Sequence, residues 1–404
     1  MKKLPLIAVI ATTLFAGCKD DDNDDNLVTP VTPTPLESAL ALDSAEVKFA
    51  GSIDFDNLDN YEGQNIPDYI NKDNTANNGI SNKGATLGRV LFYDKELSID
   101  RSLSCASCHQ QQFAFSDTSL RSKGVNGGLT GRHSMRLINS RFADETQFFW
   151  DERASTLEEQ TTMPIQDHAE MGFSGQNGNP DLNDLLVRMR ALQYYKELFN
   201  WVYEDTTINE NRIQLALAQF VRSIQSFDSK FDQGFAAVNG NLNANFNNYT
   251  AEENQGKQLF VSPSMLGGAG CQACHRAPEF DISPNSGNNG VITSITAAND
   301  INNTRAPSLR DLFDSNGVLN GPLMHDGSMA NLAAVIDHYN QITIDPANTN
   351  LDNRLRGRPG GPGGPPATGQ NLSLSQTEKD ALVAFIKTLS GSNVYTDTKW
   401  SDPF

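Results

Sequence analysis

Residues 102–117 read SLSCASCHQQQFAFSD, and residues 268–280 read GAGCQACHRAPEF. Each stretch holds two cysteines three positions apart, and a histidine follows the second cysteine directly. The chain has 404 residues but only five cysteines, so four of the five are used in these two places. The fold has to be built around this repeated pattern, which consists of Cys105, Cys108 and His109 in the first copy and Cys271, Cys274 and His275 in the second.

A Cys-x-x-Cys pair could serve as a redox dithiol, as half of a zinc site or as part of a disulfide framework, and two pairs could form a four-cysteine zinc site. None of these uses requires a histidine directly after the pair. Attachment of haem c does, because the two thiols bond to the haem and the imidazole that follows becomes an axial ligand of the iron. The two copies therefore favour two covalently bound haems c over zinc or disulfides.

The composition is that of a globular protein, with 38% hydrophobic and 20% charged residues. The net charge of -18 argues against nucleic acid as a partner, because the phosphates would be repelled. The same charge could steer a basic protein partner, or it could serve only to keep the chain in solution.

The N-terminus is typical of a targeting segment. Residues 1–18, MKKLPLIAVIATTLFAGC, combine a basic start, a short apolar run and small residues before Cys18. This pattern predicts a lipoprotein signal peptide with Cys18 as the lipidated residue, and an ordinary cleaved secretory signal is the alternative. Residues 19–36, acidic and then rich in Thr and Pro, predict an extended tether. We expect an exported protein, in the periplasm or at the cell surface, lipid-anchored to the outer membrane.

The rest of the chain reads as mostly α-helical. Residues 84–97 predict an amphipathic helix with Leu87, Val90 and Leu91 on one side. Residues 250–263 predict a second helix, which opens with a capping box. A helix followed by Cys-x-x-Cys-His is thus repeated, which indicates two copies of a small cytochrome-like unit. The boundaries that we predict are residues 37–245 for the first haem domain and 246–404 for the second.

Three further segments have recognisable patterns. In residues 209–232 apolar residues recur at helical spacing, and residues 373–391 predict a closing helix with its apolar side inward. Residues 239–249, rich in Asn and Gly, indicate an interdomain linker, and residues 356–370 indicate a flexible surface excursion. The apolar positions are Ile213, Leu217, Phe220, Ile224 and Phe227 in the first of these segments and Leu382, Phe385, Ile386 and Leu389 in the closing helix.

Several stretches, in one order along residues 80–390, resemble the bacterial dihaem cytochrome c peroxidase and MauG family. They are CASCHQQQFAFSD, GRHSMRLINSRF, FFWDERASTLEEQTTMPIQDHAEMG, GCQACH, RAPSLRDLF and GPLMHDGSMANLAAVIDHYN. The resemblance implies two α-helical cytochrome-like domains with one haem each. It also implies that the N-terminal haem is the peroxide site, that the C-terminal haem takes electrons from a donor, and that a tryptophan lies between them.

The resemblance assigns roles to four residues. Trp150 matches the tryptophan between the haems, although a buried tryptophan is usually only a core residue. Glu170 matches a distal glutamate that can move a proton from one peroxide oxygen to the other; by spacing alone it is one of many surface carboxylates. Gln160 and Pro164 match other distal positions, and they could equally be a solvent-facing helix residue and a helix stop.

The chain departs from the family pattern after the first motif. Many family peroxidases have a histidine there that blocks the resting peroxidatic iron, but the only histidine between His109 and Trp150 is His133. We therefore expect an open, five-coordinate first haem, with an inward movement of His133 as the alternative. His133 stands at the position of a calcium-site asparagine, and imidazole suits calcium poorly. A calcium ion that uses backbone carbonyls of Asn320 and Pro322 is left open.

A second departure concerns the sixth ligand of the C-terminal haem. The register places Tyr339 where many relatives have methionine, and tyrosine is the MauG-like choice. A phenolate would favour ferric iron and lower the potential. A packed helix aromatic is the alternative for Tyr339, and the competing ligands nearby are Met324, Met329 and His338. Arg310 could pair with a haem propionate or be exposed, while His168 and His325 receive no chemical role.

The function that we expect is a peroxidase that reduces hydrogen peroxide to water with electrons from a small cytochrome or cupredoxin. Electrons would enter at the His275 haem, pass Trp150 and reach the His109 haem. The alternatives are a MauG-like oxidase that modifies a partner protein with peroxide, and a dihaem electron-transfer lipoprotein without turnover of its own. A homodimer is left open.

Overall fold

The computed structural model describes residues 43–144, 147–282, 285–294, 296, 299–357 and 368–404. The predicted signal peptide, Cys18 and the tether lie outside the described residues, as does most of the predicted excursion at 356–370. Within the described residues the chain is mostly helical, as predicted, and its strands are two-residue pieces. No helix among them is long and apolar enough to span a membrane.

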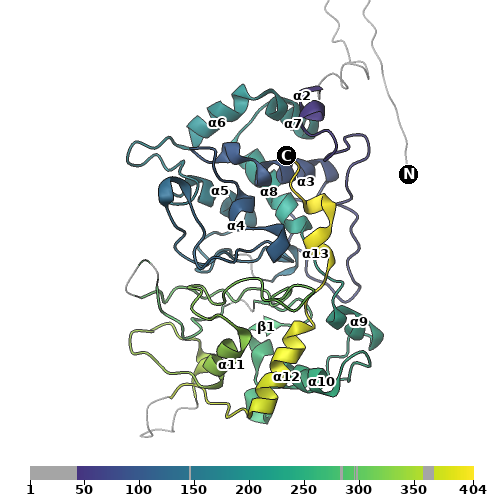
Figure 1. Ribbon diagram of the computed structural model, residues 1–404, viewed down its shortest axis with the longest axis vertical. Coiled ribbons are helices and arrows are strands. Elements are labelled where there is room, and N and C mark those ends of the chain that lie inside the picture. The colour runs from purple at the N-terminus through teal and green to yellow at the C-terminus, as the bar shows by residue number, and fades with distance from the viewer. Residues whose placement is uncertain (1–42, 145–146, 283–284, 295, 297–298, 358–367) are drawn as a thin grey trace, which may run out of the picture. The chain divides into compact units, whose positions relative to one another are not determined.

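The first apolar core lies mainly within residues 45–224, and we call this part the first lobe (Figure 1). The predicted helix before the first motif is present, and Leu87, Val90 and Leu91 are fully buried. The helices of the first lobe are α2 (Asp43–Lys48), α3 (Asn82–Tyr93), α4 (Cys105–Cys108), α5 (Leu157–Gln166), α6 (Leu182–Ala191), α7 (Gln193–Tyr203) and α8 (Glu210–Ser223).

The second apolar core lies mainly within residues 231–389, which we call the second lobe (Figure 1). The capping box predicted at Thr250 and Glu253 opens α10. The elements of the second lobe are α9 (Lys230–Ala237), α10 (Ala251–Val261), a 3-10 turn at Cys271–Ala273, α11 (Leu332–Asn340), α12 (Gln376–Lys387) and the antiparallel pair β1 (His275–Arg276) and β2 (Asp281–Ile282).

The two lobes repeat one packing arrangement. In the first lobe α3 packs on α8, and in the second α10 packs on α12. A glycine stands at each crossing: a Cβ on Gly88 would lie 2.0 Å from the Ala216 carbonyl oxygen, and a Cβ on Gly256 would lie 1.8 Å from the Ala381 carbonyl oxygen. In both lobes the glycine-bearing helix leads into the Cys-x-x-Cys-His motif, so the close crossing fixes where the motif begins.

Two sequence expectations need correction. The helix predicted through Phe227 ends earlier, because α8 stops at Ser223 and Ile224 is its C-cap, although Ile224 remains fully buried. The predicted linker at 239–249 is not free of the core, since Phe246 and Tyr249 are buried within it. Along the chain, the change from the first apolar core to the second also comes before residue 245, because Phe231 already packs in the second core. The domain boundary at 245/246 remains a prediction.

The last residues return to the first lobe. The chain leaves α12 in the second core, forms α13 (Asn393–Thr396) and ends in a 3-10 turn at Thr398–Trp400. Trp400 is 2% exposed and belongs to the first core. Its Nε1 donates to Ser223 Oγ over 3.2 Å, and its carbonyl oxygen accepts from the Tyr93 hydroxyl over 2.7 Å. The C-terminal segment therefore joins the two lobes.

Candidate functional site: two cavities with a shared wall

The first Cys-x-x-Cys-His motif borders a cavity of about 420 Å³ in the first lobe. Cys105 and Cys108 lie on the short helix α4, and His109 is the residue that ends it. All three side chains line the cavity, together with Trp150 and Glu170. The structure thus brings the first motif and two of the distant predicted site residues to one space.

The imidazole of His109 is oriented for metal binding. Its Nδ1 lies 3.1 Å from the Phe115 carbonyl oxygen and 3.2 Å from Ser134 Oγ. A carbonyl oxygen only accepts hydrogen bonds, so Nδ1 carries the proton and the lone pair is on Nε2. Burial lowers the pKa of His109, which keeps the ring neutral. A neutral imidazole held at Nδ1 by a carbonyl is the usual arrangement of a histidine ligand.

Within the described residues, the cysteines form neither a disulfide nor a shared four-cysteine zinc site. All four are free of disulfides, and the two pairs line different cavities. Within the described residues, no group of three or more His, Cys, Asp and Glu side chains could hold a metal ion. Burial, and then the neighbouring Cys108, raises the pKa of Cys105 to about 12, so its thiol is not a ready thiolate.

Glu170 has the properties of a group that can exchange a proton in the first cavity. Burial, followed by the negative charge of Asp167, raises the pKa of Glu170 to about 7, while Arg153 opposes the shift. A carboxyl with a pKa near 7 can both accept and donate a proton at neutral pH. Gln160 and Pro164 also line this cavity from α5. Pro164 lies inside α5, two residues before its end, so it is not a helix stop.

The backbone around Glu170 is held by the loop that follows the first motif. Val125 N donates to the Glu170 carbonyl oxygen over 2.9 Å. A Cβ on Gly124 would lie 1.7 Å from the Ala169 carbonyl oxygen, and one on Gly128 would lie 2.3 Å from it. Only glycine lets this loop approach so closely. The position of the Glu170 carboxyl is therefore set by residues well outside the motif that contains it.

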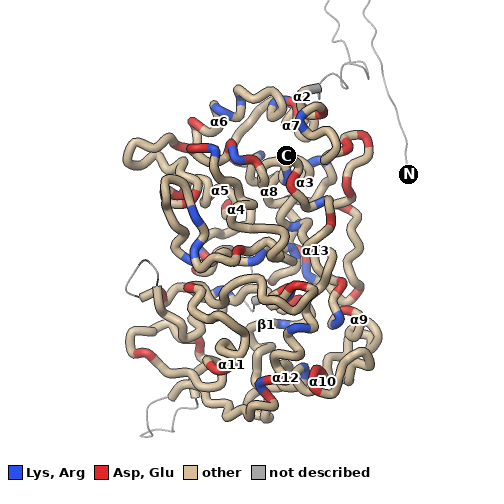
Figure 2. Tube along the Cα trace, viewed as in Figure 1, with Lys and Arg blue, Asp and Glu red and all other residues tan. Residues whose placement is uncertain are grey.

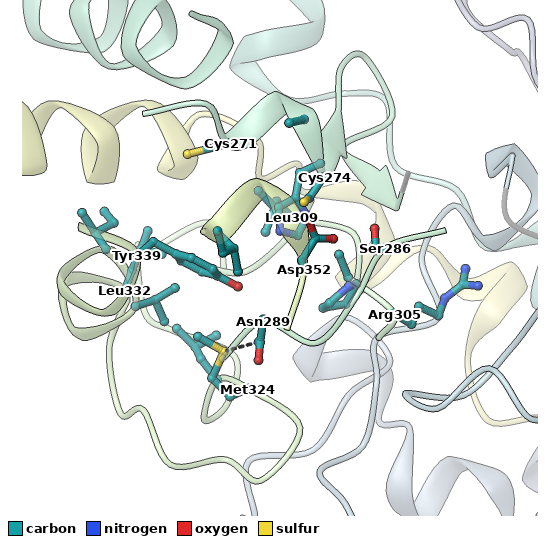
Figure 3. A pocket seen from close by; sticks show the side chains of 18 of the residues that line it. Cys271, Cys274, Ser286, Asn289, Arg305, Leu309, Met324, Leu332, Tyr339 and Asp352 are labelled. Carbon is teal, nitrogen blue, oxygen red and sulfur yellow. Dashed lines mark hydrogen bonds between the residues drawn. The ribbon is translucent and has the colours of Figure 1, made fainter. Parts of the chain in front are cut away.

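The second motif borders another cavity, of about 190 Å³ (Figure 3). Cys271, Cys274, His275 and Tyr339 all line it, so the predicted ligands of the second haem share one space. Burial lowers the pKa of His275 to about 4, which keeps its imidazole neutral. Burial, and then Cys274, raises the pKa of the Tyr339 phenol above its usual value.

Of the three residues that compete with Tyr339 as ligand of the second haem, only Met324 lines the cavity. Met324 lines the cavity together with Tyr339, whereas Met329 and His338 are not among the residues that line it. Asn289 lies beside Met324 in Figure 3, and its Nδ2 donates to Met324 Sδ over 3.4 Å. The carbonyl oxygen of Asn289 is itself 2.9 Å from His338 Nε2. His338 thus supports the wall and does not face the cavity.

Trp150 belongs to both cavities. Its side chain lines each of them, and its Nε1 donates to the His133 carbonyl oxygen over 2.7 Å. The ring packs edge-on against buried His325, with 6.3 Å between the ring centroids. His325 was given no role from the sequence, and it lies behind the tryptophan as a packing partner. The hydrogen bond and the ring contact fix Trp150 in the wall that the cavities share.

The comparisons agree with this geometry. Residues 82–239 match the family described as di-haem cytochrome c peroxidase. The methylamine utilization protein MauG of Methylophilus methylotrophus is 31% identical over 324 residues, which cover 78% of this chain and 84% of the relative. The chain belongs to the dihaem cytochrome c peroxidase and MauG family.

Two other comparisons place the chain within this family. The cytochrome c551 peroxidase of Nitrosomonas europaea is 26% identical over 323 residues, covering 76% of this chain and 80% of the relative. The crystal structure of a MauG-like protein associated with microbial copper homeostasis superposes with a TM-score of 0.62 at 28% identity, covering 84% of this chain and 98% of that one.

Membership of the family implies haem c, and the residues present fit that group. Each cavity offers a Cys pair and a neutral histidine, and the first holds its histidine by Nδ1. The calcium ion that uses backbone carbonyls of Asn320 and Pro322 remains a prediction. The Asn320 Nδ2 donates to the Asp311 carbonyl oxygen and to the Tyr395 hydroxyl, and His133 Nδ1 is 3.0 Å from the Ser119 carbonyl oxygen. These bonds leave the two backbone carbonyls as the ligands to test.

Arg310 does not meet either expectation from the sequence. It is fully buried, lines neither cavity, and forms a two-pronged ion pair with Asp232 at 2.8 and 2.9 Å. It also donates to the Pro278 carbonyl oxygen. An arginine paired in this way is a structural tie between α9 and the segment that follows the second motif. It is neither a propionate ligand nor an exposed residue.

Sequence reasoning missed three residues of the cavity walls. Ser134 orients His109, Asn289 supports the second cavity, and Arg136 lines both cavities. None of them lies in a pattern with a chemical meaning of its own. A signal was available only for Arg136, since a charged residue in the otherwise apolar stretch MRLI is unexpected on a buried segment.

Proposed function

We propose that this protein is a dihaem peroxidase that reduces hydrogen peroxide to water with electrons from a small cytochrome or cupredoxin. One haem c would be held by Cys105, Cys108 and His109, and the other by Cys271, Cys274 and His275. The observation that carries the proposal is the Glu170 carboxyl, with a pKa of about 7, in the wall of the cavity that His109 also lines. Simple electron transfer needs no such group.

When bound, a haem in the first cavity would supply the iron that reacts with peroxide, and a haem in the second would supply electrons. The chain supplies the rest. Glu170 accepts a proton from one peroxide oxygen and returns it to the other, which is the leaving oxygen. Gln160, on the same cavity wall, offers an amide that can hold peroxide in line with the carboxylate. Trp150 occupies the shared wall through which electrons have to pass.

We also propose that the first site is open in the resting protein. His133 is 5% exposed, and its Nδ1 hydrogen bond to Ser119 ties the ring to the wall. Burial lowers the pKa of His133 to about 4, so protonation at neutral pH does not release it. An EPR spectrum of the oxidised protein should contain a high-spin ferric signal, and its absence would contradict an open site.

A MauG-like oxidation of a partner protein is the second candidate. The MauG of Methylophilus methylotrophus has a higher identity to this chain than the Nitrosomonas peroxidase, 31% against 26%. Tyr339 at the second cavity also favours it, because a phenolate ligand would hold the second iron ferric and make it a poor entry point for electrons. Both candidate functions use the first cavity for the reaction with peroxide. They differ at the second cavity, which takes in donor electrons only in the peroxidase.

The deciding experiment is steady-state peroxide consumption with reduced cytochrome c as electron donor. Rapid oxidation of the donor, lost in Glu170→Gln, supports the peroxidase. A fast reaction with peroxide that leaves a long-lived oxidised spectrum, with slow donor oxidation, supports the MauG-like candidate. If the protein does not react with peroxide at all, the result supports a protein that only transfers electrons.

Four further parts of the proposal have their own measurements. Fatty-acid labelling that disappears in Cys18→Ala would support lipid anchoring, and fractionation of cells tests the outer membrane. Limited proteolysis of the full-length protein tests the domain boundary, with a first cut near residue 245 expected. Metal analysis of purified protein before and after chelation tests the calcium ion at Asn320 and Pro322. Sedimentation tests the homodimer.

A further inference from the structure

Seven residues line both cavities, and among the described residues one of them, Arg136, has a positive charge without a carboxylate partner. The seven come from residues 133–136 and from Trp150, Arg305 and Pro307. Arg136 and Arg305 are the charged members of this shared wall. Arg305 lies 3.7 Å from Asp281 in an ion pair, whereas no ion pair of Arg136 is found within the described residues.

The other arginines at the cavities are all paired. Arg132 binds Asp151 and Asp300, Arg153 binds Asp151, and Arg354 binds Asp352, at distances from 2.6 to 2.8 Å. A buried guanidinium is costly unless a negative charge or several acceptors compensate it. The chain follows this rule at each cavity arginine except Arg136.

The contacts of Arg136 leave most of its guanidinium without a hydrogen-bond acceptor. Nη2 donates to the Ser308 carbonyl oxygen over 3.1 Å. Nε is buried and has no hydrogen-bond partner in the described part of the chain. Burial lowers the pKa of Arg136 to about 10, against a weak opposing effect of Tyr395 and Asp311. Within the described residues, one neutral carbonyl thus holds the side chain in the wall, and no carboxylate forms an ion pair with it.

A haem brings the missing anion. Each haem carries two propionate carboxylates, and a guanidinium binds a carboxylate through two parallel hydrogen bonds. We propose that Arg136 binds a haem propionate in the wall shared by the two cavities, and that it acts there as a positioning residue for electron transfer. This inference rests on the two proposed haems. It assigns to Arg136 the role that the sequence analysis considered for Arg310.

The ion pair has a consequence for redox chemistry. A cation close to a haem stabilises the reduced iron relative to the oxidised iron, because oxidation adds a positive charge. Arg136 therefore raises the midpoint potential of the haem whose propionate it binds. Removing the charge should lower that potential without removing the haem, which is attached through cysteines.

The test uses the full-length, haem-loaded protein. Arg136→Gln and Arg136→Met remove the charge, and Arg136→Lys keeps it. The control is Arg101→Gln, which removes an exposed charge that lines neither cavity. Midpoint potentials of both haems are measured by spectroelectrochemistry after haem content is determined. We expect a lower potential of at least one haem in the Gln and Met variants, a value near wild type in the Lys variant, and no change in the control.

Unchanged potentials in the Gln and Met variants would overturn the inference, as would equal shifts in the Lys and Gln variants. Arg136→Lys provides a second measurement if the neutral variants do not fold. The propionate bending band in its resonance Raman spectrum should shift, because the two-pronged hydrogen bond is lost, and an unshifted band overturns the inference. A wild-type protein without a Soret band would instead overturn the proposed haems, so the two failures are distinguishable.

Discussion

At the scale of single residues, the Glu170 carboxyl sets the pH range of the proposed reaction. Only the carboxylate can accept a proton from peroxide, and its pKa is raised to about 7. The rate of the reaction with peroxide should therefore fall as the pH drops through 7 and level off above it. Stopped-flow measurement at a series of pH values tests this.

The variant Glu170→Gln should lack this pH limb and react about 10²- to 10⁴-fold more slowly at pH 8, the usual contribution of a general base. Glu46→Gln, which changes an exposed carboxyl of the same lobe, is the matched control and should keep both rate and limb. A limb near pH 7 that persists in Glu170→Gln would mean that another group titrates.

Tyr339 and Met324 give opposite predictions for the second iron. A phenolate is a hard ligand and a thioether a soft one, so the spectra of the two forms differ. If Tyr339 is the ligand, Tyr339→Phe should change the low-spin ferric spectrum while Met324→Leu leaves it unaltered. The reverse result would assign the site to Met324, and a change in neither variant would remove both.

The residues that bear motifs could be found from the sequence, and those that support them could not. Cys105 and His109 have a spacing with a chemical meaning, and Glu170 was reached through resemblance. Arg310 was misjudged because an isolated arginine looks the same whether it faces a cavity or a buried aspartate. Its pairing with Asp232 depends on the arrangement of two segments that lie 78 residues apart.

At the scale of helices, the two glycine crossings leave no room for a larger residue. A methyl group on Gly88 or Gly256 would overlap a backbone carbonyl, which cannot rotate away as a side chain could. Gly88→Ala and Gly256→Ala should each lower the free energy of unfolding by at least about 1–3 kcal/mol, the usual cost of overpacking. Chemical denaturation measures this loss.

Gly79→Ala and Gly131→Ala are suitable controls, because nothing lies within 4 Å of a Cβ at either position. We expect their effects to be small. If Gly88→Ala or Gly256→Ala unfolds at the same denaturant concentration as these controls, the helices can move apart without a loss of stability, which contradicts the prediction.

Helix positions followed from apolar periodicity, but helix ends did not. The spacing of Ile213, Leu217 and Phe220 continues through Ile224 and Phe227, so the pattern predicts a longer helix than α8. Ile224 is fully buried although it lies outside the helix. Burial is a property of the packed lobe, and a pattern of burial cannot distinguish a helix from the loop that follows it in the same core.

At the scale of the whole molecule, the net charge of -18 bears on the choice of donor. Acidic and basic residues are interspersed along the described residues (Figure 2), so the negative charge of this part of the chain is not confined to one site. Donor oxidation with a basic cytochrome should slow as ionic strength rises from low to physiological values, since screening weakens the attraction. The reaction with peroxide, a neutral molecule, serves as the control and should not change.

The C-terminal segment gives a second prediction at this scale. Trp400 is 2% exposed in the first core, far along the chain from its neighbours there. Trp400→Ala should lower the free energy of unfolding by about 3–5 kcal/mol, the usual cost of removing a large buried aromatic side chain. Asp402→Ala, at an exposed neighbour, should cost little. Equal stability of the two variants would contradict the role of Trp400.

The return of residues 393–404 to the first lobe also couples the unfolding of the two lobes. The chain runs from α12 in the second core to Trp400 in the first core. Separation of the lobes therefore pulls on Trp400, whose Nε1 donates to Ser223 Oγ and whose carbonyl oxygen accepts from the Tyr93 hydroxyl. We expect one cooperative unfolding transition, in which neither lobe opens alone.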